Sequence, residues 1–439
     1  MNKSLTIFLE SLKTNGTPGI DECVKHLGEH LPLLLELEYT EQDPEWHAEG
    51  NVHIHTGMVL DELYILLESD ALHISGEMRQ ALVLATLLHD IGKPVCTKRR
   101  EINDVIRVVS PGHEDKGRSY LAYKLMETGL SYFVIKTILG LVGEHHMPKL
   151  LVVRDKPIGD YLSLARQAEC ELLYYLELAD MSGRHCPDKS KQLEYLELFK
   201  MFCMEYQVWK PKEAACYPGY QDWQAHLLRE LSDYDANTID LIYGNAVRDR
   251  ENGLISTASE AIARSFQYRD SFPQLVVMCG PSGSGKTRWI QNHLSGYAVV
   301  SLDDIREDIC GDRTNQKIRG QVMQEAKSQL KHHLRSKNRV VWDATNLRKD
   351  FRAQICALGF SYQALVTLVI FQQEEAAYFE GNEKRSRSVP KDILQRQLDS
   401  LQWPTVDEAH RSLIVKKDLT QHYEGTLQKS EFFSDEFVK

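Results

Sequence analysis

An eight-residue stretch, Gly280-Pro-Ser-Gly-Ser-Gly-Lys-Thr287, has the spacing G-x-x-x-x-G-K-[ST] and follows an apolar run. Glycines allow successive backbone N–H groups to turn towards phosphate oxygens, and the N-terminus of a following helix favours their negative charge. Lys286 can reach the β- and γ-phosphates, and the Thr287 hydroxyl can ligate Mg²⁺. The stretch therefore predicts binding of ATP or another nucleoside triphosphate with Mg²⁺. The predicted contact residues are Gly280, Ser282, Gly283, Ser284, Gly285, Lys286 and Thr287.

Histidines and carboxylates recur through the first half of the chain, next to the ends of predicted helices. They are His47, His53, His55, His89, Asp90, His113, His145, His146 and Asp180. Imidazole and carboxylate groups suit divalent metals that activate water. A helical bundle can gather side chains from several helix ends into one pocket. The group predicts a divalent metal centre, in which we interpret His47 and His53 as structural residues.

Three polar groups in the second half could handle phosphate. They are Asp303-Asp-Ile-Arg306, Asp343-Ala-Thr-Asn346 and the cations Lys384, Arg385 and Arg387 before Pro390. A carboxylate can take a proton from an attacking hydroxyl, and arginine can hold a phosphate. The alternatives are a helix cap for Asp304, strand-to-helix turn chemistry for Asp343 and Asn346, and a solvated face for the cations.

The elements that must position these residues differ between the two halves. Helical patterns dominate the first half, whereas apolar runs at 275–279, 297–302, 339–342 and 364–371 alternate with helical patterns in the second. Such alternation is typical of a parallel α/β sheet, in which ligand-handling residues follow the strand C-termini. We therefore predict a multi-domain chain, an all-α domain followed by an α/β P-loop domain with a parallel sheet. The predicted boundaries are 1–200, a helical connector at 201–268, 269–410, and a C-terminal tail at 411–439 with a final helix near its start.

The histidine pattern resembles the HD phosphohydrolase superfamily. The sequence motifs are most similar to those of the HD domains found with tRNA nucleotidyltransferases. These motifs are Trp46-His-Ala-Glu-Gly-Asn-Val-His-Ile-His-Thr56, Leu87-Leu-His-Asp-Ile-Gly-Lys-Pro94 and Gly112-His-Glu114. The resemblance covers about residues 40–185 and implies an all-helical phosphoesterase that uses Mn, Ni, Co, Zn or Fe. It implies His55, His89, Asp90 and Asp180 as core metal ligands, with His113, His145 and His146 for a second metal. Asp90 would bridge the two metals, and Lys93 would contact phosphate. The alternative is a degenerate HD fold kept for packing.

The four groups of the second half together resemble the phage-type polynucleotide 5′-hydroxyl kinase family, over about residues 274–405. The resemblance implies Asp303 as general base on a 5′-OH and Arg306 on the nucleic-acid phosphate. Lys286 and Thr287 would serve the donor phosphates and Mg²⁺, and Arg385 would be the lid arginine. Because the lid is shorter here than in the phage enzyme, Lys384 and Arg387 are the other candidates for that role. Arg387 would bind nucleotide, while Asp343 and Asn346 are further candidates.

An HD domain followed by such a kinase resembles the bacterial HD–polynucleotide kinase family of RNA end-healing enzymes. The resemblance implies RNA ends, or DNA ends, as substrate, and a separate RNA ligase as a partner. Two alternatives remain open. One is a zeta-toxin-like or nucleoside kinase fused to a phosphohydrolase, and the other is a signalling protein in which ATP binding gates an HD hydrolase.

Composition agrees with an ordinary globular protein, with 439 residues, 42% hydrophobic and 26% charged. The net charge of −11 argues against a surface coated with basic residues. The nine scattered cysteines, the interrupted apolar N-terminus and the lack of about 18 consecutive apolar residues predict a cytoplasmic protein without a membrane span. The sequence leaves open the metal, the phosphate position, the NTP donor and the oligomeric state.

Overall fold

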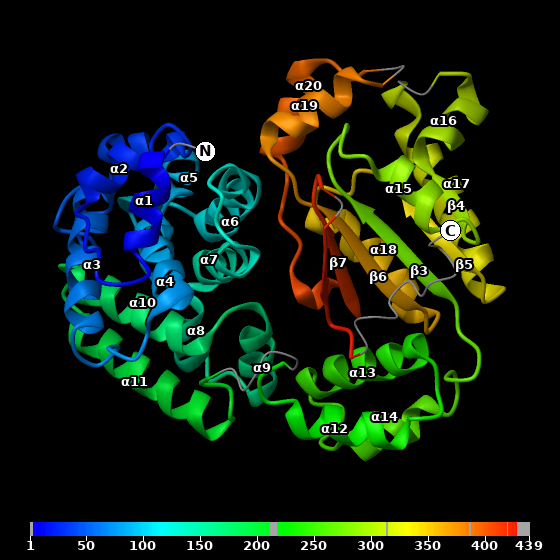
Figure 1. The fold of residues 1–439 in the computed structure, drawn as a ribbon, viewed down its shortest axis with the longest axis horizontal. Helices are drawn as coiled ribbons and strands as arrows, with labels where there is room; N and C mark the ends of the chain where they lie inside the picture. The colour runs from blue at the N-terminus through cyan, green and yellow to red at the C-terminus, as the bar shows by residue number, and fades with distance from the viewer. Residues whose placement is uncertain (1–2, 211–216, 313–314, 386–387, 419, 428–439) are drawn as a thin grey trace. The chain divides into compact units, whose positions relative to one another are not determined.

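The computed structural model describes residues 3–210, 217–312, 315–385, 388–418 and 420–427 (Figure 1). The chain forms two compact units, Met1–Gly219 and Tyr220–Lys439. The division falls inside the stretch expected as a connector, so 201–268 is not a separate region. Its helices belong partly to the first unit and partly to the second.

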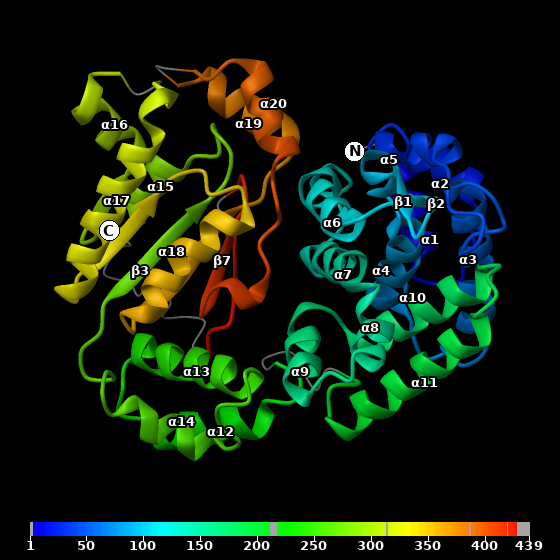
Figure 2. The same cartoon turned by 180° about the vertical axis from the view of Figure 1, so that it is seen from behind.

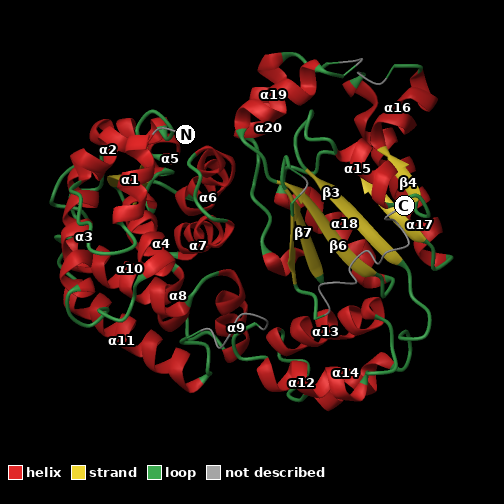
Figure 3. Cartoon of the chain, viewed as in Figure 1, coloured by secondary structure: helices red, strands yellow, loops and turns green. Residues whose placement is uncertain are grey.

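The first unit is helical apart from one hairpin (Figure 3). Its helices are α1 (Lys3–Ser11), α2 (Ile20–Leu27), α3 (Val52–Leu67), α4 (Gly76–Leu88), α5 (Lys93–Cys96), α6 (His113–Lys124), α7 (Tyr132–Glu144), α8 (Met147–Val153), α9 (Ile158–Gln167), α10 (Cys170–Gly183) and α11 (Lys189–Glu205). Short 3₁₀ turns lie at Pro32–Tyr39 and Leu125–Glu127, and the strands β1 (Lys98–Ile102) and β2 (Val105–Val109) pair antiparallel. The expected all-α class is confirmed.

Helix α4 lies at the centre of this bundle. Every residue from Arg79 to Leu88 is buried, and α4 packs against α3, α7 and α10. A helix that is buried on all sides must lie in the interior, because no face is left for solvent. Since α4 ends at Leu88, the next two residues, His89 and Asp90, are delivered to the buried middle of the unit.

The second unit begins with three helices and continues as an α/β domain. Its helices are α12 (Gln221–Glu230), α13 (Ala236–Glu251), α14 (Ala258–Ser265), α15 (Lys286–His293), α16 (Leu302–Cys310), α17 (Arg319–Arg335), α18 (Lys349–Ser361), α19 (Glu375–Glu383) and α20 (Lys391–Asp399). Its strands are β3 (Gln274–Cys279), β4 (Ala298–Ser301), β5 (Arg339–Asp343), β6 (Leu365–Phe371), β7 (Arg411–Val415) and β8 (Gln421–Glu424). Short 3₁₀ turns lie at Gln316–Ile318 and Val406–Glu408.

The six strands form one sheet in the order β4-β5-β3-β6-β7-β8, in which only β8 is antiparallel to its neighbour. Alternate residues of β3 face opposite sides of the sheet. Val276 and Met278 pack with α15, whereas Leu275 lies against α18, which covers β3 and β6 (Figure 2). The parallel α/β class is confirmed, and β3 delivers the phosphate loop at the middle of the sheet.

The expected final helix near the start of the tail is wrong, whereas residues 428–439 of the expected loose tail lie outside the described residues. Arg411–Val415 is a fully buried strand that pairs with β6, and β8 adds to its outer edge. The Arg411 guanidinium is buried and donates to Asp240 Oδ2 and Asn237 Oδ1, both at 2.8 Å. A short apolar run cannot be assigned to a helix or a strand from its pattern alone. Here the run forms a strand because it pairs with the open edge of β6.

Helix α13 is an integral part of the second unit. Its buried Asp240 accepts hydrogen bonds from Arg411, from Thr426 Oγ1 at 2.6 Å and from Leu427 N at 3.0 Å. A side chain at Gly244 would come within 2.7 Å of His410, so the helix approaches the sheet closely at that glycine. Among the described residues, no helix is both long and apolar enough to cross a membrane.

Candidate functional site

Five helix regions bring the predicted metal ligands of the first unit together. His55 lies on α3, His89 and Asp90 follow α4, and His113 begins α6. His145 and His146 follow α7, and Asp180 lies on α10. His55 Nε2 lies 3.0 Å from Asp180 Oδ1, and His89 Nε2 lies 3.2 Å from Asp90 Oδ2. The distant sequence positions therefore form one cluster, and all of its members except His146 are buried.

Local backbone contacts fix the orientation of three imidazoles. The Nδ1 atoms of His89, His113 and His145 lie 2.7 to 2.8 Å from the carbonyl three residues earlier in each case. A carbonyl only accepts, so each Nδ1 carries the proton and each Nε2 presents a lone pair to the cluster. The Nε2 atoms of His55, His89, His113 and His145 are buried without a hydrogen-bond partner among the described residues. Buried lone pairs that converge in this way fit a divalent cation.

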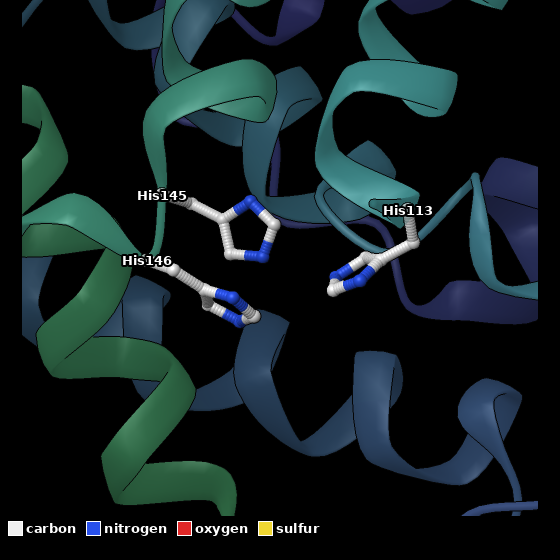
Figure 4. Close-up of side chains that lie close together, drawn as sticks. All are labelled: His113, His145 and His146. Atoms are coloured by element: carbon white, nitrogen blue, oxygen red, sulfur yellow. The ribbon is translucent and has the colours of Figure 1, made fainter. Parts of the chain in front are cut away.

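The ligands form two groups. The ligand atoms of His55, His89 and Asp180 lie within 4.8 Å of one another, and so do those of His113, His145 and His146 (Figure 4). Asp90 lies between the groups. Its Oδ2 is 3.2 Å from His89 Nε2, and its Oδ1 is 3.1 Å from His113 Nε2. The arrangement fits two metals with Asp90 between them.

The charges around the cluster suit metal ligation. Burial alone would raise the pKa of Asp90, but the positive charge of Lys93 opposes it, and that pKa lies well below its usual value. Burial also opposes ionisation of Asp180, and Arg184 and His55 hold its pKa well below the usual value. Burial, together with neighbouring histidines, lowers the pKa of His145 and of His146 well below the ordinary value. Both carboxylates are therefore charged and both imidazoles neutral, as ligands must be.

Two carboxylates that orient the ligands are absent from the sequence-based set. Glu49 Oε1 lies 2.8 Å from His55 Nδ1 and 2.9 Å from His47 Nδ1. Glu114 Oε1 lies 2.7 Å from His146 Nδ1. Carboxylates in this position fix the tautomer and raise the basicity of a metal-bound imidazole. Both glutamates lie inside the quoted motifs, so the motifs already contained the signal.

Of the other charged and histidine residues near the cluster, some contact its members and one does not. Lys93 Nζ lies 2.7 Å from Asp90 Oδ2, and Arg184 Nη2 donates to both oxygens of Asp180 at 2.8 and 2.6 Å. The ring of His47 lies edge-on to His55, at 4.8 Å between centroids. By contrast, His53 pairs with the exposed Asp21 at 3.1 Å. His53 thus lies outside the cluster, whereas His47 borders it through Glu49.

The phosphate loop of the second unit has the backbone that its glycines predict. Gly283 and Gly285 adopt positive φ angles of 84° and 92°, and α15 begins at Lys286. A Cβ atom at Gly283 would lie 2.3 Å from the Tyr378 carbonyl and 2.7 Å from Asn382 N. Gly283 therefore lets the loop lie directly against α19, and Thr287 is exposed at the start of α15.

Lys286 folds back over the loop. Its Nζ donates to the carbonyls of Gly280 and Pro281, both at 2.8 Å, and to Ser284 Oγ at 3.3 Å. Burial lowers the pKa of Lys286 to about 8, against the opposing charge of Asp343 and with a contribution from Arg385. A bound phosphate would replace these neutral acceptors with charged oxygens.

Three carboxylates lie at the strand ends beside the loop. Burial raises the pKa of Asp343; Lys286 opposes that rise, and the charges of Asp303 and Asp304 add to it. Asp303 is exposed and accepts a hydrogen bond from Arg306 Nη1 at 2.7 Å. The side chain that caps α16 is Ser301, whose Oγ accepts from Asp304 N at 3.3 Å. The expected cap at Asp304 is therefore wrong.

Asn346 is placed differently from the other candidates. Its Nδ2 donates to Met278 O at 2.6 Å, and its Oδ1 accepts from Trp342 Nε1 at 3.2 Å. The residue is buried at a φ of 47°. Its amide joins β3 to β5 and so supports the loop.

The lid segment is closed on itself by Asn382, and the helix that follows it contacts the phosphate loop through Gln397. Asn382 donates to Val389 O at 2.7 Å and accepts from Val389 N at 2.9 Å, while Gln397 Oε1 accepts from Ser282 N at 2.8 Å. Lys384 and Arg385 are exposed on this segment. Arg387 lies outside the described residues.

Two domain families match the chain. The HD domain matches residues 52–180, and an AAA domain matches residues 275–404. The chain joins an HD domain to a P-loop kinase-like domain. This combination supports a bifunctional kinase and hydrolase, and it implies a nucleotide with Mg²⁺ and a divalent metal in the HD domain.

Solved structures with similarity include a gluconokinase from Sinorhizobium meliloti 1021, at 21% identity over 33% of this chain and 83% of that chain. A structure of the PezAT chromosomal toxin–antitoxin system of Streptococcus pneumoniae has 18% identity over 38% of this chain and 80% of that chain. Both TM-scores are 0.26, which is too low to support any conclusion. No curated protein sequence matches the chain.

Proposed function

We propose that the protein heals broken RNA ends. The second unit would phosphorylate a 5′-OH, and the first would remove a 2′-phosphate or open a 2′,3′-cyclic phosphate. The observation that supports the proposal is that one chain carries both a histidine–carboxylate cluster that could hold a metal and a phosphate loop with the Asp303–Arg306 pair in the same unit. Cleavage of RNA by transesterification leaves a 5′-OH on one fragment and a cyclic phosphate on the other, so each centre corresponds to one end.

In the kinase reaction, Asp303 would accept the proton of the 5′-OH as the hydroxyl oxygen attacks the γ-phosphorus. The new O–P bond forms as the bond to the β-phosphate oxygen breaks, and the nucleoside diphosphate leaves. Lys286 and Arg385 would balance the charge on the transferring group. Arg306, at 2.7 Å from Asp303, would place an acceptor phosphate beside the base. Exposure of the Asp303 carboxylate leaves it open to a substrate hydroxyl.

In the phosphoesterase reaction, a bound divalent metal would supply a water molecule with a lowered pKa. The imidazole Nε2 atoms and the carboxylates of Asp90 and Asp180 would hold it. Lys93 lies next to Asp90 and is almost buried, so its ammonium can contact a phosphate oxygen that enters the cluster. Glu49 and Glu114 would keep His55 and His146 in the correct tautomer.

The proposed substrates are RNA ends, or DNA ends, and a separate RNA ligase would seal the healed pair. The proposed compartment is the cytoplasm. The eight cysteines that the structure describes are all free, which is usual in a reducing compartment.

The experiment uses one RNA that carries a 5′-OH and a 2′,3′-cyclic phosphate. It is incubated with ATP, Mg²⁺ and a transition metal, and both ends are analysed by mass. The proposal expects a 5′-phosphate on one end and loss of the cyclic phosphate on the other. Phosphorylation of free nucleosides or sugars, with none of the RNA, would favour a small-molecule kinase instead.

A further inference from the structure

A pocket of about 260 Å³ opens beside Arg306 in the second unit. Residues of α16, α17, α18 and α20 line it, together with the segment that follows β5. Ligand pockets in proteins usually measure about 300–1,000 Å³, so this one has room for a single small group. Because Arg306 pairs with Asp303, the pocket lies next to the proposed general base.

The floor of the pocket is apolar. Val322, Trp342 and Ile355 line it and are buried. The indole N–H of Trp342 is already bonded to Asn346, which fixes the ring in place. A flat apolar group can lie on such a floor without leaving a buried donor unpaired.

The rim of the pocket carries cations around an aromatic ring. Arg319 and Arg348 place their guanidinium carbons 4.9 and 5.0 Å from the ring centroid of Phe351. Arg348 is also held by Asp350 through contacts of 3.0 and 2.7 Å, which partly neutralise its charge. Arg319 forms no ion pair with any other residue that the structure describes, so its charge remains available.

We propose that this pocket holds the 5′-terminal nucleoside of the acceptor strand, with its base on the apolar floor and against Phe351. Arg319, which lines the same pocket as Arg306, would bind the first internucleotide phosphate together with it. The inference rests on the proposed kinase function and adds a determinant of specificity to it. The apolar part of the lining suits a nucleobase, and the cationic rim suits a phosphate. Aromatic stacking tolerates every base, so the pocket selects polynucleotides without reading their sequence.

The test compares Phe351→Ala and Arg319→Ala with Arg335→Ala, which removes an exposed arginine of the same helix away from the pocket. The two pocket variants should raise the KM for a 5′-OH oligonucleotide about tenfold, the effect of losing one stacking or phosphate contact. KM for ATP should stay within about twofold of the unaltered protein, because the phosphate loop is unchanged. Arg335→Ala should resemble the unaltered protein in both constants.

A second comparison separates the role of Arg319 from a general loss of packing. The acceptors are a nucleoside 3′-phosphate and the same nucleoside without phosphate. The defect of Arg319→Ala should appear only with the phosphorylated acceptor, whereas that of Phe351→Ala should appear with both. Phe351→Leu replaces the alanine variant if Phe351→Ala does not fold. It should also bind the acceptor less tightly, because leucine has no flat ring for the base to stack on.

Several results would overturn the inference. Equal acceptor KM values for the pocket variants and Arg335→Ala, in a protein that phosphorylates 5′-OH oligonucleotides, would refute the pocket and leave the kinase function intact. An equal rise in KM for the phosphorylated and the unphosphorylated nucleoside in Arg319→Ala would also refute the pocket and leave the kinase function intact. Failure of the unaltered protein to phosphorylate or bind any 5′-OH oligonucleotide, measured by fluorescence anisotropy, would instead refute the kinase function and the inference with it.

Discussion

Glu49 Oε1 lies 2.8 Å from His55 Nδ1, on the side of the imidazole opposite the metal ligand atom. The other ring nitrogen of His55, Nε2, lies 3.0 Å from Asp180 Oδ1, so the Glu49 carboxylate lies behind an imidazole that faces the cluster. We therefore expect Glu49 to act on a bound metal through His55. The structure contains a second such pair in Glu114 and His146.

Glu49→Gln should weaken metal binding by about 10- to 100-fold, because the neutral amide lacks the charge with which a carboxylate raises the basicity of the imidazole. Titration of the metal-free protein with Mn²⁺, followed by calorimetry, measures the change. His53→Ala is the matched control, since His53 lies on α3, the helix of His55, but outside the cluster. If Glu49→Gln bound Mn²⁺ as tightly as His53→Ala, the orienting role of Glu49 would be refuted.

The affinity for ATP should depend on pH through Lys286. Its pKa in the free protein is lowered to about 8, and phosphate favours the charged form, so ATP binding should raise that pKa. Protons are then taken up on binding near pH 8, and affinity falls as pH rises above 8. Calorimetry in two buffers of different ionisation enthalpy measures the uptake. Lys286→Arg should abolish it, because arginine stays charged throughout this range.

Asp303→Asn should reduce the kinase kcat by about 100- to 10,000-fold, the usual contribution of a general base. Binding of ATP should change little, since Asp303 touches Arg306 rather than the loop. Asp308→Asn, an exposed carboxylate on the same helix, is the control. A kcat for Asp303→Asn equal to that of Asp308→Asn would remove Asp303 from the catalytic role.

Asn346→Ala should destabilise the second unit rather than alter its chemistry. The change leaves Trp342 Nε1 and Met278 O without their buried partner, at a cost of about 1–3 kcal/mol for each group. Thermal unfolding of the second-unit transition should shift downwards. At a temperature where the variant is folded, kcat should stay within about threefold of the unaltered protein. A large loss of kcat without loss of stability would instead support the earlier interpretation of Asn346 as a site residue.

Many residues of both candidate sites could be predicted, because they belong to short sequence motifs. The spacing around Lys286 determines which backbone amides can turn inwards, and the residues that follow each strand must meet at one edge of the sheet. The predicted metal ligands from His55 to Asp180 can likewise form one site if the helix ends that carry them converge. The cluster confirms that they do.

Other features depend on contacts between distant parts of the chain and could not be predicted in this way. Nothing local indicates that Asp240 of α13 holds Arg411. The run Leu413–Val415 becomes a strand only because β6 leaves an edge open for it. Asn346 follows an acidic strand end, as a site residue would, but its left-handed backbone turns the amide into the core.

The central claim is that one chain holds two independent centres that act on the two ends of a broken RNA. The most direct test treats one RNA, with a 5′-OH and a 2′,3′-cyclic phosphate, with Lys286→Ala and with Asp90→Asn, and determines the mass of both ends. We predict that Lys286→Ala leaves the 5′-OH unchanged but still removes the cyclic phosphate, and that Asp90→Asn does the reverse. Loss of both activities in either well-folded variant would contradict the claim.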